Sequence, residues 1–468
     1  LSRFRRGLAR KGIVASRRNR VRPLPGLRYP ATDPAAPLRY DSPAIQRGQS
    51  MPKTQIPASS SLANVRYEIR GRLARRAHEL ERLGYEIISL NIGNPGAFGF
   101  RTPETMRLAM IENMPAAEGY CHQKGIFPAR EAVVMQQQDR GVLGVTAEDV
   151  FIGNGVSELI DLVLRALLED GDEVLVPSPD YPLWTAAVTL NSGKAVHYPC
   201  RPERGFEPDP EEIERLVTRR TRAIVVINPN NPTGAVYSQE TLTAIARLAE
   251  RHRLVVFADE IYDGMTYDDA RFVPMATLVH DTLCGTLSGV SKVNRACGYR
   301  VGWASFSGVR DKAQDYLQGL ELLSSLRLCS NVPGQWAVQT ALGGYQSIRD
   351  LVVPGGRLYQ SRQAIIDGVS RSKYLQLTVP RGAMYAFVRV ASDRLAGFDD
   401  QAFAMDLLEN RHVLVAPGVS FNAPYRDHFR ITNLPDAETL ATVFSRIEDE
   451  LDSWASGKTR GGAIRAVQ

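Results

Sequence analysis

The fold is decided by residues 223–259, which read A-I-V-V-I-N-P-N-N-P-T-G-A-V-Y-S-Q-E-T-L-T-A-I-A-R-L-A-E-R-H-R-L-V-V-F-A-D. Ala223–Ile227 and Leu254–Ala258 are short apolar runs rich in β-branched residues, which indicates strands that are buried on both faces. Between them, Gln239–Arg251 has the amphipathic pattern of a helix. This order of strand, helix and strand predicts a βαβ unit within a parallel sheet.

The same alternation continues on both sides of this unit. Further strands are expected at Glu173–Val176, Thr282–Leu287 and Gly302–Phe306, and a further helix at Ser157–Leu168. A separate helix is expected from Arg72 onward with Gly84 as its cap, and its apolar stripe consists of Leu73, Ala77, Leu80 and Leu83. The sequence therefore predicts an α/β fold, in which ligands bind at the carboxyl ends of the parallel strands.

Length and composition are those of a globular protein. The chain has 468 residues, which allows two or three domains at roughly 100–200 residues each. Its 44% hydrophobic and 23% charged residues argue against a disordered or fibrous protein, and no apolar run is long enough for a transmembrane helix. Five cysteines without a C-x-x-C pair favour a reducing compartment, so we expect a cytoplasmic protein without a metal site.

The basic charge is confined to the first 50 residues. Residues 1–50 contain eleven Arg and one Lys against two Asp, so they carry +10, whereas the whole chain carries +6. We expect this segment to be a disordered extension, with a targeting peptide or a nucleic-acid arm as the alternatives, and the stretch from Met51 resembles an ordinary protein start. The remaining residues are slightly acidic and give no charge argument for nucleic acid.

Polar residues follow both strands of the βαβ unit. Asp259 ends the second strand, Tyr262 follows three residues later, and Asn231 lies in the turn after the first strand. Taken alone, the aspartate is typical of a helix N-cap and the Asn-Pro steps are typical of an ordinary loop. At a shared sheet edge, however, Asp259 can meet a protonated pyridine nitrogen, and Tyr262 can meet a phenolic oxygen on the same ring.

Two further segments favour binding of an anion. In G-N-G-V-S-E, the residues Gly155, Val156 and Ser157 lie where a strand gives way to a helix N-terminus, whose N–H groups attract negative charge. The loop after Thr282–Leu287 contains Ser291, Lys292 and then Arg300. The hydroxyl of Ser291 and the bidentate cation of Arg300 suit a phosphate monoester. A lysine in such a loop is, by itself, most often a solvated surface residue.

Pyridoxal phosphate combines the four features that these residues would bind: a phosphate, a ring nitrogen, a ring hydroxyl and a carbonyl for a lysine. Here the sequence resembles the fold-type I pyridoxal-phosphate enzymes, specifically the class I/II aminotransferases and, among them, the bacterial-type alanine (glutamate–pyruvate) aminotransferases. The resemblance runs from about Ser61 into the C-terminal region. The motifs that carry it are L-N-I-G-N-P (Leu90–Pro95), G-N-G-V-S-E-L-I, P-S-P-D-Y-P-L-W-T-A-A-V (Pro177–Val188), N-P-N-N-P-T-G-A-V-Y, F-A-D-E-I-Y-D and A-L-G-G-Y-Q-S-I (Ala341–Ile348).

The resemblance implies roles for individual residues. Lys292 is similar to the lysine that binds the cofactor covalently and serves as general base, and Tyr181 to the aromatic residue that stacks on the cofactor ring. Tyr120 is similar to a tyrosine that reaches the phosphate of the other subunit, which implies a homodimer with shared sites. Arg430 is similar to the arginine that binds the substrate carboxylate, and Gly93 and Asn231 are similar to further substrate contacts.

The resemblance also implies a domain organisation. It gives a large cofactor-binding domain at residues 98–335 with a mostly parallel seven-stranded sheet between helices. A smaller α+β domain follows at residues 336–468, and residues 51–97 form an N-terminal arm that belongs in part to the small domain. Where the family tends to have S-K-T-Y-R, this chain has S-K-V-N-R, so Val293 and Asn294 depart from the pattern.

The activity implied is ping-pong transfer of an amino group between an L-amino acid, expected to be alanine, and a 2-oxo acid, expected to be 2-oxoglutarate. Two alternatives stay on the same fold: a carbon–sulfur β-lyase and an aminotransferase of other specificity. A third is a ligand-sensing domain of a DNA-binding regulator. That hypothesis needs a helix-turn-helix module, which the Pro- and Arg-rich residues 1–50 do not supply.

Overall fold

The computed structural model describes residues 56–65, 71–391, 394–395 and 397–457, so the expected disordered extension at 1–50 lies outside the described residues. The strands are β1 (Ile88–Ser89), β2 (Val150–Gly153), β3 (Glu173–Ser178), β4 (Lys194–Pro199), β5 (Thr221–Ile227), β6 (Val255–Asp259), β7 (Leu283–Gly289), β8 (Gly302–Gly308), β9 (Leu375–Leu377), β10 (Tyr385–Val390), β11 (Val413–Leu414), β12 (Ala416–Pro417) and β13 (His428–Thr432). The α-helices are α1 (Arg72–Arg82), α2 (Glu104–Glu112), α3 (Phe127–Asp139), α4 (Val156–Arg165), α5 (Leu183–Leu190), α6 (Pro210–Arg215), α7 (Gln239–His252), α8 (Gln314–Leu326), α9 (Val332–Gln335), α10 (Val338–Gly343), α11 (Ile348–Val352), α12 (Arg357–Arg371), α13 (Asp400–Arg411) and α14 (Ala437–Ala455).

A seven-stranded sheet forms the centre of the fold, in the order β2-β8-β7-β6-β5-β3-β4. The strands from β7 through β6, β5 and β3 to β4 are parallel, whereas β8 runs antiparallel to both β7 and β2. The predicted α/β fold with a mostly parallel seven-stranded sheet is thus confirmed. β8 departs from the parallel pattern because the described stretch 290–301, which joins it to β7, contains no crossover α-helix.

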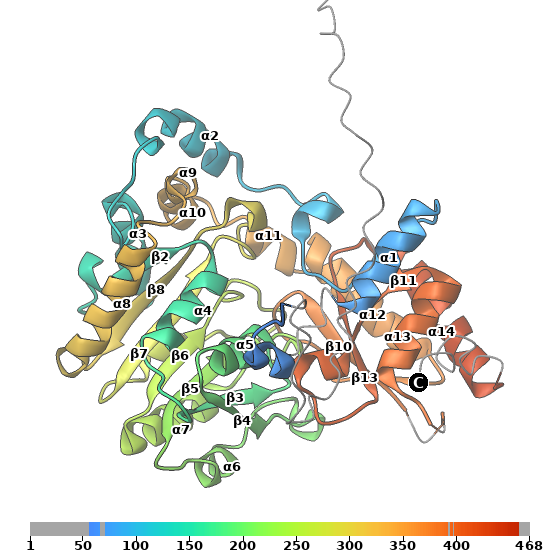
Figure 1. Ribbon diagram of the computed structural model, residues 1–468. Helices are drawn as coiled ribbons and strands as arrows, with labels where there is room; N and C mark the ends of the chain where they lie inside the picture. The colour runs from blue at the N-terminus through green and yellow to red at the C-terminus, as the bar shows by residue number, and fades with distance from the viewer. Residues whose placement is uncertain (1–55, 66–70, 392–393, 396, 458–468) are drawn as a thin grey trace, which may run out of the picture. The chain divides into compact units, whose positions relative to one another are not determined.

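Helices cover both faces of this sheet, as Figure 1 shows for α4, α5 and α7. The side chains of β5 alternate between the faces, which is the two-residue period of a strand. Ile224 and Val226 belong to the core cluster that contains the buried face of α7, whereas Val225 and Ile227 belong to the cluster that contains the buried face of α4. Every residue of the run expected at 223–227 is therefore buried, as the sequence predicts.

A smaller antiparallel sheet, in the order β12-β13-β10-β9, follows in the C-terminal part of the chain. Its core also contains residues of α12, α13 and α14. The short strand β1 pairs in parallel with β11, so the segment between α1 and α2 joins this C-terminal part. The domain boundaries expected at residues 97 and 335 stay predictions, because the described residues from Ala58 onward form one compact unit.

The first helix differs in one detail from the expected stripe. In α1, Ala77 and Leu80 are buried and Leu73 is partly buried against the same core. Leu83, the fourth expected member, lies at the C-cap and is 69% exposed, because the helix ends at Arg82 and the next turn is not helical. Gly84 has a φ of +94°, a left-handed conformation that suits the expected cap glycine.

The small sheet meets the large one next to the Asn-Pro turn. The backbone N–H groups of Arg381 and Gly382, just before β10, both donate to the carbonyl oxygen of Gly234 at 2.8 Å. This contact brings the first residues of β10 and the middle of β13 to the carboxyl ends of β5 and β6. No helix in the described part of the chain combines the length and the apolar character that crossing a membrane would require.

Candidate active site

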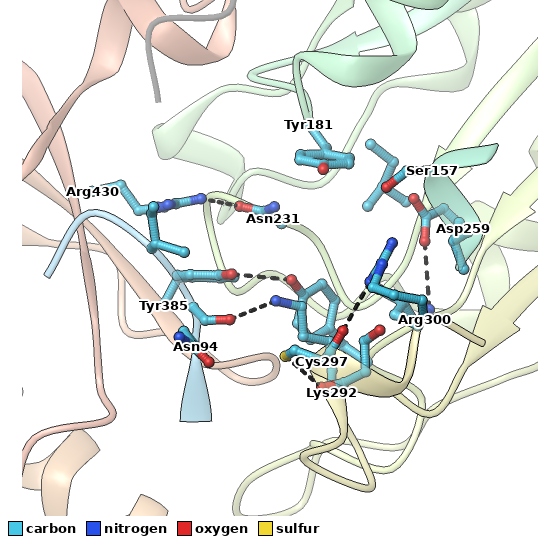
Figure 2. Close-up of a pocket in the computed structure, with 18 residues that line it drawn as sticks. Asn94, Ser157, Tyr181, Asn231, Asp259, Lys292, Cys297, Arg300, Tyr385 and Arg430 are labelled. Atoms are coloured by element: carbon cyan, nitrogen blue, oxygen red, sulfur yellow. Dashed lines mark hydrogen bonds between the residues drawn. The ribbon is translucent and has the colours of Figure 1, made fainter. Parts of the chain in front are cut away.

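A pocket of about 660 Å³ opens where the strands of the large sheet end and the small sheet approaches them (Figure 2). The sequence-predicted site residues that line it are Gly93, Val156, Ser157, Tyr181, Asn231, Asp259, Tyr262, Ser291, Lys292, Arg300 and Arg430. They come from seven separate segments of the chain. The cavity has the size of a site for a small organic ligand, which typically has about 300–1,000 Å³.

One end of the pocket is built to bind an anion. Gly155 is the N-cap of α4 with a φ of +85°, and the helix begins at Val156, so the first backbone N–H groups of α4 face this end. Arg300 donates from Nη2 to the carbonyl of Asn154 at 3.0 Å. A Cβ atom on Gly155 would lie 2.4 Å from that Nη2 atom, so only glycine permits this close approach of the arginine. Gly155 does not itself line the cavity.

Asp259 lies at the end of β6 and is buried, with 3% of its surface exposed. Its Oδ2 atom accepts a hydrogen bond from Trp184 Nε1 at 3.0 Å, and Oδ1 has a weak contact with the backbone N–H of Ile261 at 3.5 Å. Burial raises the pKa of this carboxyl to about 6, although the Trp184 and Ile261 donors and the charge of Lys292 each act to lower it. The chain after Asp259 continues as a turn, so the residue is not a helix N-cap.

Arg430, in the middle of β13, is buried, with 2% of its surface exposed. It donates from Nη1 to Asn231 Oδ1 at 2.8 Å and from Nη2 to the carbonyl of Asn91. The rings of Tyr385 and Phe421 lie 4.2 Å and 4.5 Å from its guanidinium carbon. These contacts fix the position of a planar cation at the edge of the pocket, the group best suited to pair with a carboxylate.

Lys292 lies in the loop between β7 and β8, and its Nζ atom donates to the carbonyl oxygen of Gly93 at 2.7 Å. Figure 2 shows this amine directed toward the same cavity as Asn231 and Arg430. A Cβ atom on Gly93 would lie 2.1 Å from the hydroxyl of Tyr385, so a glycine at this position lets the backbone carbonyl approach the lysine. The amine is thus held by a neutral acceptor inside the pocket.

Tyr385 is a pocket residue that the sequence analysis missed. Its hydroxyl accepts a hydrogen bond from the hydroxyl of Tyr262 at 3.2 Å. Burial raises the pKa of the Tyr385 phenol, but the positive charges of Lys292 and Arg430 and the hydrogen bond from Tyr262 together outweigh burial and lower it. The residue begins strand β10 and has the buried, aromatic character of an ordinary core position, so no local signal marks it.

Cys297 and Asn94 also line the cavity and were not predicted from the sequence. Cys297 donates from Sγ to the carbonyl of Ser291 at 2.9 Å, while its own carbonyl accepts a hydrogen bond from Arg300 Nη1 at 2.9 Å. The thiol and the carbonyl therefore fix the two ends of the loop that carries Lys292. Tyr120 lies outside the pocket, and 82% of its surface is exposed.

Comparisons with known proteins agree on one family. The family model described as "Aminotransferase class I and II" matches residues 85–447. The Escherichia coli K12 protein named "Glutamate-pyruvate aminotransferase AlaA" is 49% identical over 391 residues, which cover 84% of this chain and 96% of that protein. "Alanine aminotransferase" of Mycobacterium tuberculosis H37Rv is 46% identical over 397 residues, covering 85% and 92%. The crystal structure of an aminotransferase from Escherichia coli superposes with a TM-score of 0.85 at 48% identity, covering 86% of this chain and 100% of that chain.

Proposed function

Because the chain belongs to the class I and II aminotransferase family, we propose that it transfers the amino group of L-alanine to 2-oxoglutarate with pyridoxal 5'-phosphate as its cofactor. Aminotransferase activity follows from the family, and the names of the Escherichia coli and Mycobacterium tuberculosis relatives support the alanine and glutamate–pyruvate pair. The observation that carries the proposal is the joint presence, in one cavity, of the Lys292 amine and the buried Arg430 guanidinium.

The residues of the pocket fit this cofactor. The N-terminus of α4 and Arg300, brought together at Gly155, would hold its phosphate, and the buried carboxylate of Asp259 would pair with its protonated ring nitrogen. Asn231 and Tyr262 are the proposed partners of the ring oxygen. Tyr181 is the proposed stacking residue, with Ser291 as a further phosphate contact. When bound, pyridoxal phosphate supplies an electron-withdrawing ring that stabilises negative charge at the α-carbon of the substrate.

The remaining chemistry belongs to the side chains. Arg430 binds the α-carboxylate that every amino-acid and 2-oxo-acid substrate has, and it thereby presents the α-carbon to Lys292. The Lys292 amine takes the proton from the α-carbon of the amino acid as general base, and in the second half-reaction it gives a proton to the α-carbon that comes from the 2-oxo acid. The Gly93 carbonyl orients that amine. Because one pocket serves both half-reactions in turn, the kinetics are ping-pong.

A panel of amino donors and 2-oxo acceptors tests the substrate pair. We expect L-alanine with 2-oxoglutarate, and L-glutamate with pyruvate, to give the largest kcat/KM, with parallel double-reciprocal lines as the signature of ping-pong kinetics. Release of a 2-oxo acid from a sulfur-containing amino acid without any acceptor would instead identify a carbon–sulfur β-lyase. A clear preference for another donor would contradict the alanine assignment and leave the transferase assignment intact.

We further propose that two chains form a homodimer in the cytoplasm and share their active sites through Tyr120. The exposure of 82% of this large aromatic side chain is the supporting observation, because a surface tyrosine of this kind gains burial when a partner covers it. Its hydroxyl would then contact the cofactor phosphate in the pocket of the other subunit.

A mixing experiment tests the shared site. Lys292→Ala chains and Tyr120→Ala chains are each expected to be nearly inactive as homodimers. After subunit exchange, one pocket of each heterodimer has both native residues, so activity should return to a level approaching a quarter of the native level at equal mixing, as expected from random pairing with one intact site. Exchange is monitored with differently tagged chains. If heterodimers form and no activity returns, Tyr120 does not act across the interface.

A further inference from the structure

Trp184 lies in the core next to the proposed cofactor site and contacts Asp259. It is the second residue of α5, is fully buried, and stacks on Phe257 of β6 with ring centroids 5.9 Å apart and planes inclined by 28°. The indole does not line the pocket, yet its Nε1 donates to Oδ2 of Asp259 at 3.0 Å. The side chain thus connects the apolar core between the sheet and its helices to the buried carboxylate in the pocket.

We propose that Trp184 is a positioning residue that keeps Asp259 ionised and turned toward the ring nitrogen of the cofactor. This inference rests on the proposed function, because it assumes that the ring nitrogen meets Asp259. Trp184 itself touches neither substrate nor cofactor, and its effect passes through the carboxylate.

The hydrogen-bonding character of indole supports this role. An indole N–H can donate but cannot accept, so its bond to Oδ2 favours the ionised carboxylate over a carboxyl that carries its proton on that oxygen. The second donor to Asp259, the backbone N–H of Ile261, is at 3.5 Å and is therefore weak. The bond from Trp184 is therefore the short hydrogen bond that opposes the rise in the pKa of Asp259 caused by burial.

The other charged or titratable groups around Asp259 do not replace this bond. Lys292 acts from a distance and lowers the pKa of Asp259, while Glu260, the next residue along the chain, carries a carboxyl whose own pKa is raised to about 7 by burial. Tyr262 is a buried phenol whose pKa is raised, so it stays neutral. Without the indole, the pKa of Asp259 should rise further above about 6, and the carboxyl would take up a proton near neutral pH.

Trp303 provides a matched control. It is buried to the same degree in β8, yet among the described residues its Nε1 has no hydrogen-bond partner. Trp184→Phe removes a ring and a hydrogen bond to Asp259, whereas Trp303→Phe removes a similar ring without any hydrogen bond. The difference between the two variants therefore isolates the bond from the loss of packing.

The experiment measures the dissociation constant of pyridoxal phosphate from the full chain between pH 5 and pH 8, by absorbance titration of the cofactor-free protein. At pH 7, Trp184→Phe should weaken binding by about tenfold or more, the size expected for a hydrogen bond to a charged group, and Trp303→Phe should change it by less than about threefold. As the pH falls, Asp259 takes up a proton and affinity drops. In Trp184→Phe this drop should begin at a higher pH, because the lost donor raises the pKa of the carboxyl.

A double-mutant cycle with Asp259→Asn separates the possible failures. If Trp184 acts through Asp259, adding Trp184→Phe to Asp259→Asn weakens binding no further. An equal additional loss in that background, or an unchanged pH profile in Trp184→Phe, would overturn the inference. If Asp259→Asn itself leaves affinity unchanged, the cofactor placement in the proposed function is wrong. Should Trp184→Phe fail to fold, Trp184→Met also lacks an N–H donor and does not titrate, and an unchanged pH profile there would likewise overturn the inference.

Discussion

Replacing Lys292 with alanine is expected to lower transamination turnover by at least about 10⁴-fold, because one substitution removes the residue that we propose as both general base and covalent attachment point for the cofactor. The Nζ atom of this lysine lies in the pocket and donates to the carbonyl of Gly93 at 2.7 Å, and alanine has no amine to place there. The measurement is the rate of pyruvate formation from L-alanine with saturating 2-oxoglutarate and added cofactor.

The visible absorbance of the same variant provides a second measurement. The native protein should be yellow, because a pyridoxal phosphate linked to a lysine absorbs visible light, and Lys292→Ala should lose that band while its thermal unfolding stays cooperative. Lys312→Ala, an exposed lysine outside the pocket, is the control and should keep both colour and turnover. Near-native turnover in Lys292→Ala would refute the assignment of the catalytic lysine.

The residues at strand ends were predictable because local sequence determines where they lie. Asp259 ends one apolar run that must be a strand, Asn231 lies in the turn after the neighbouring one, and adjacent parallel strands bring such residues to one edge of the sheet. Arg300 and the α4 N-terminus were likewise marked by a loop and a glycine turn. Their close approach could not be predicted, because it depends on the distance between two separate segments. It requires glycine at position 155, where a Cβ atom would clash with the Arg300 guanidinium.

Two of the residues that were missed, Trp184 and Tyr385, belong to the core. Trp184 and Tyr385 are apolar in pattern and buried, so sequence reasoning assigns them to packing, and only the fold shows that each directs one polar atom toward the pocket. Arg430 was identified by resemblance alone. The aromatic ring of Phe421 beside it follows from the pairing of β12 and β13, which no local pattern in the sequence specifies.

Replacing Arg430 with lysine should lower kcat/KM for every donor and acceptor by at least about thirtyfold, which corresponds to the lower end of the 2–5 kcal/mol range for losing a buried charge-assisted pair. Arg430 donates from one terminal nitrogen to Asn231 and from the other to the carbonyl of Asn91. A lysine has a single nitrogen, so it cannot reproduce both bonds. Without a planar fork, it also cannot pair with the substrate carboxylate through two parallel hydrogen bonds.

The pattern of the loss, rather than its size alone, identifies the role of Arg430. The α-carboxylate is common to all substrates, so the binding of alanine, glutamate and both 2-oxo acids should be weakened to a similar extent. For each of them, KM should rise more than kcat falls. The cofactor should stay bound and coloured, since its proposed partners Asp259 and Arg300 are untouched. Arg389→Lys is the control, because Arg389 lies on the neighbouring strand β10 outside this pocket and pairs with Asp427 at 2.9 Å. A loss of kcat/KM confined to one substrate would mean that Arg430 contacts the side chain of that substrate. Only a residue that binds the shared carboxylate affects the binding of all four substrates together.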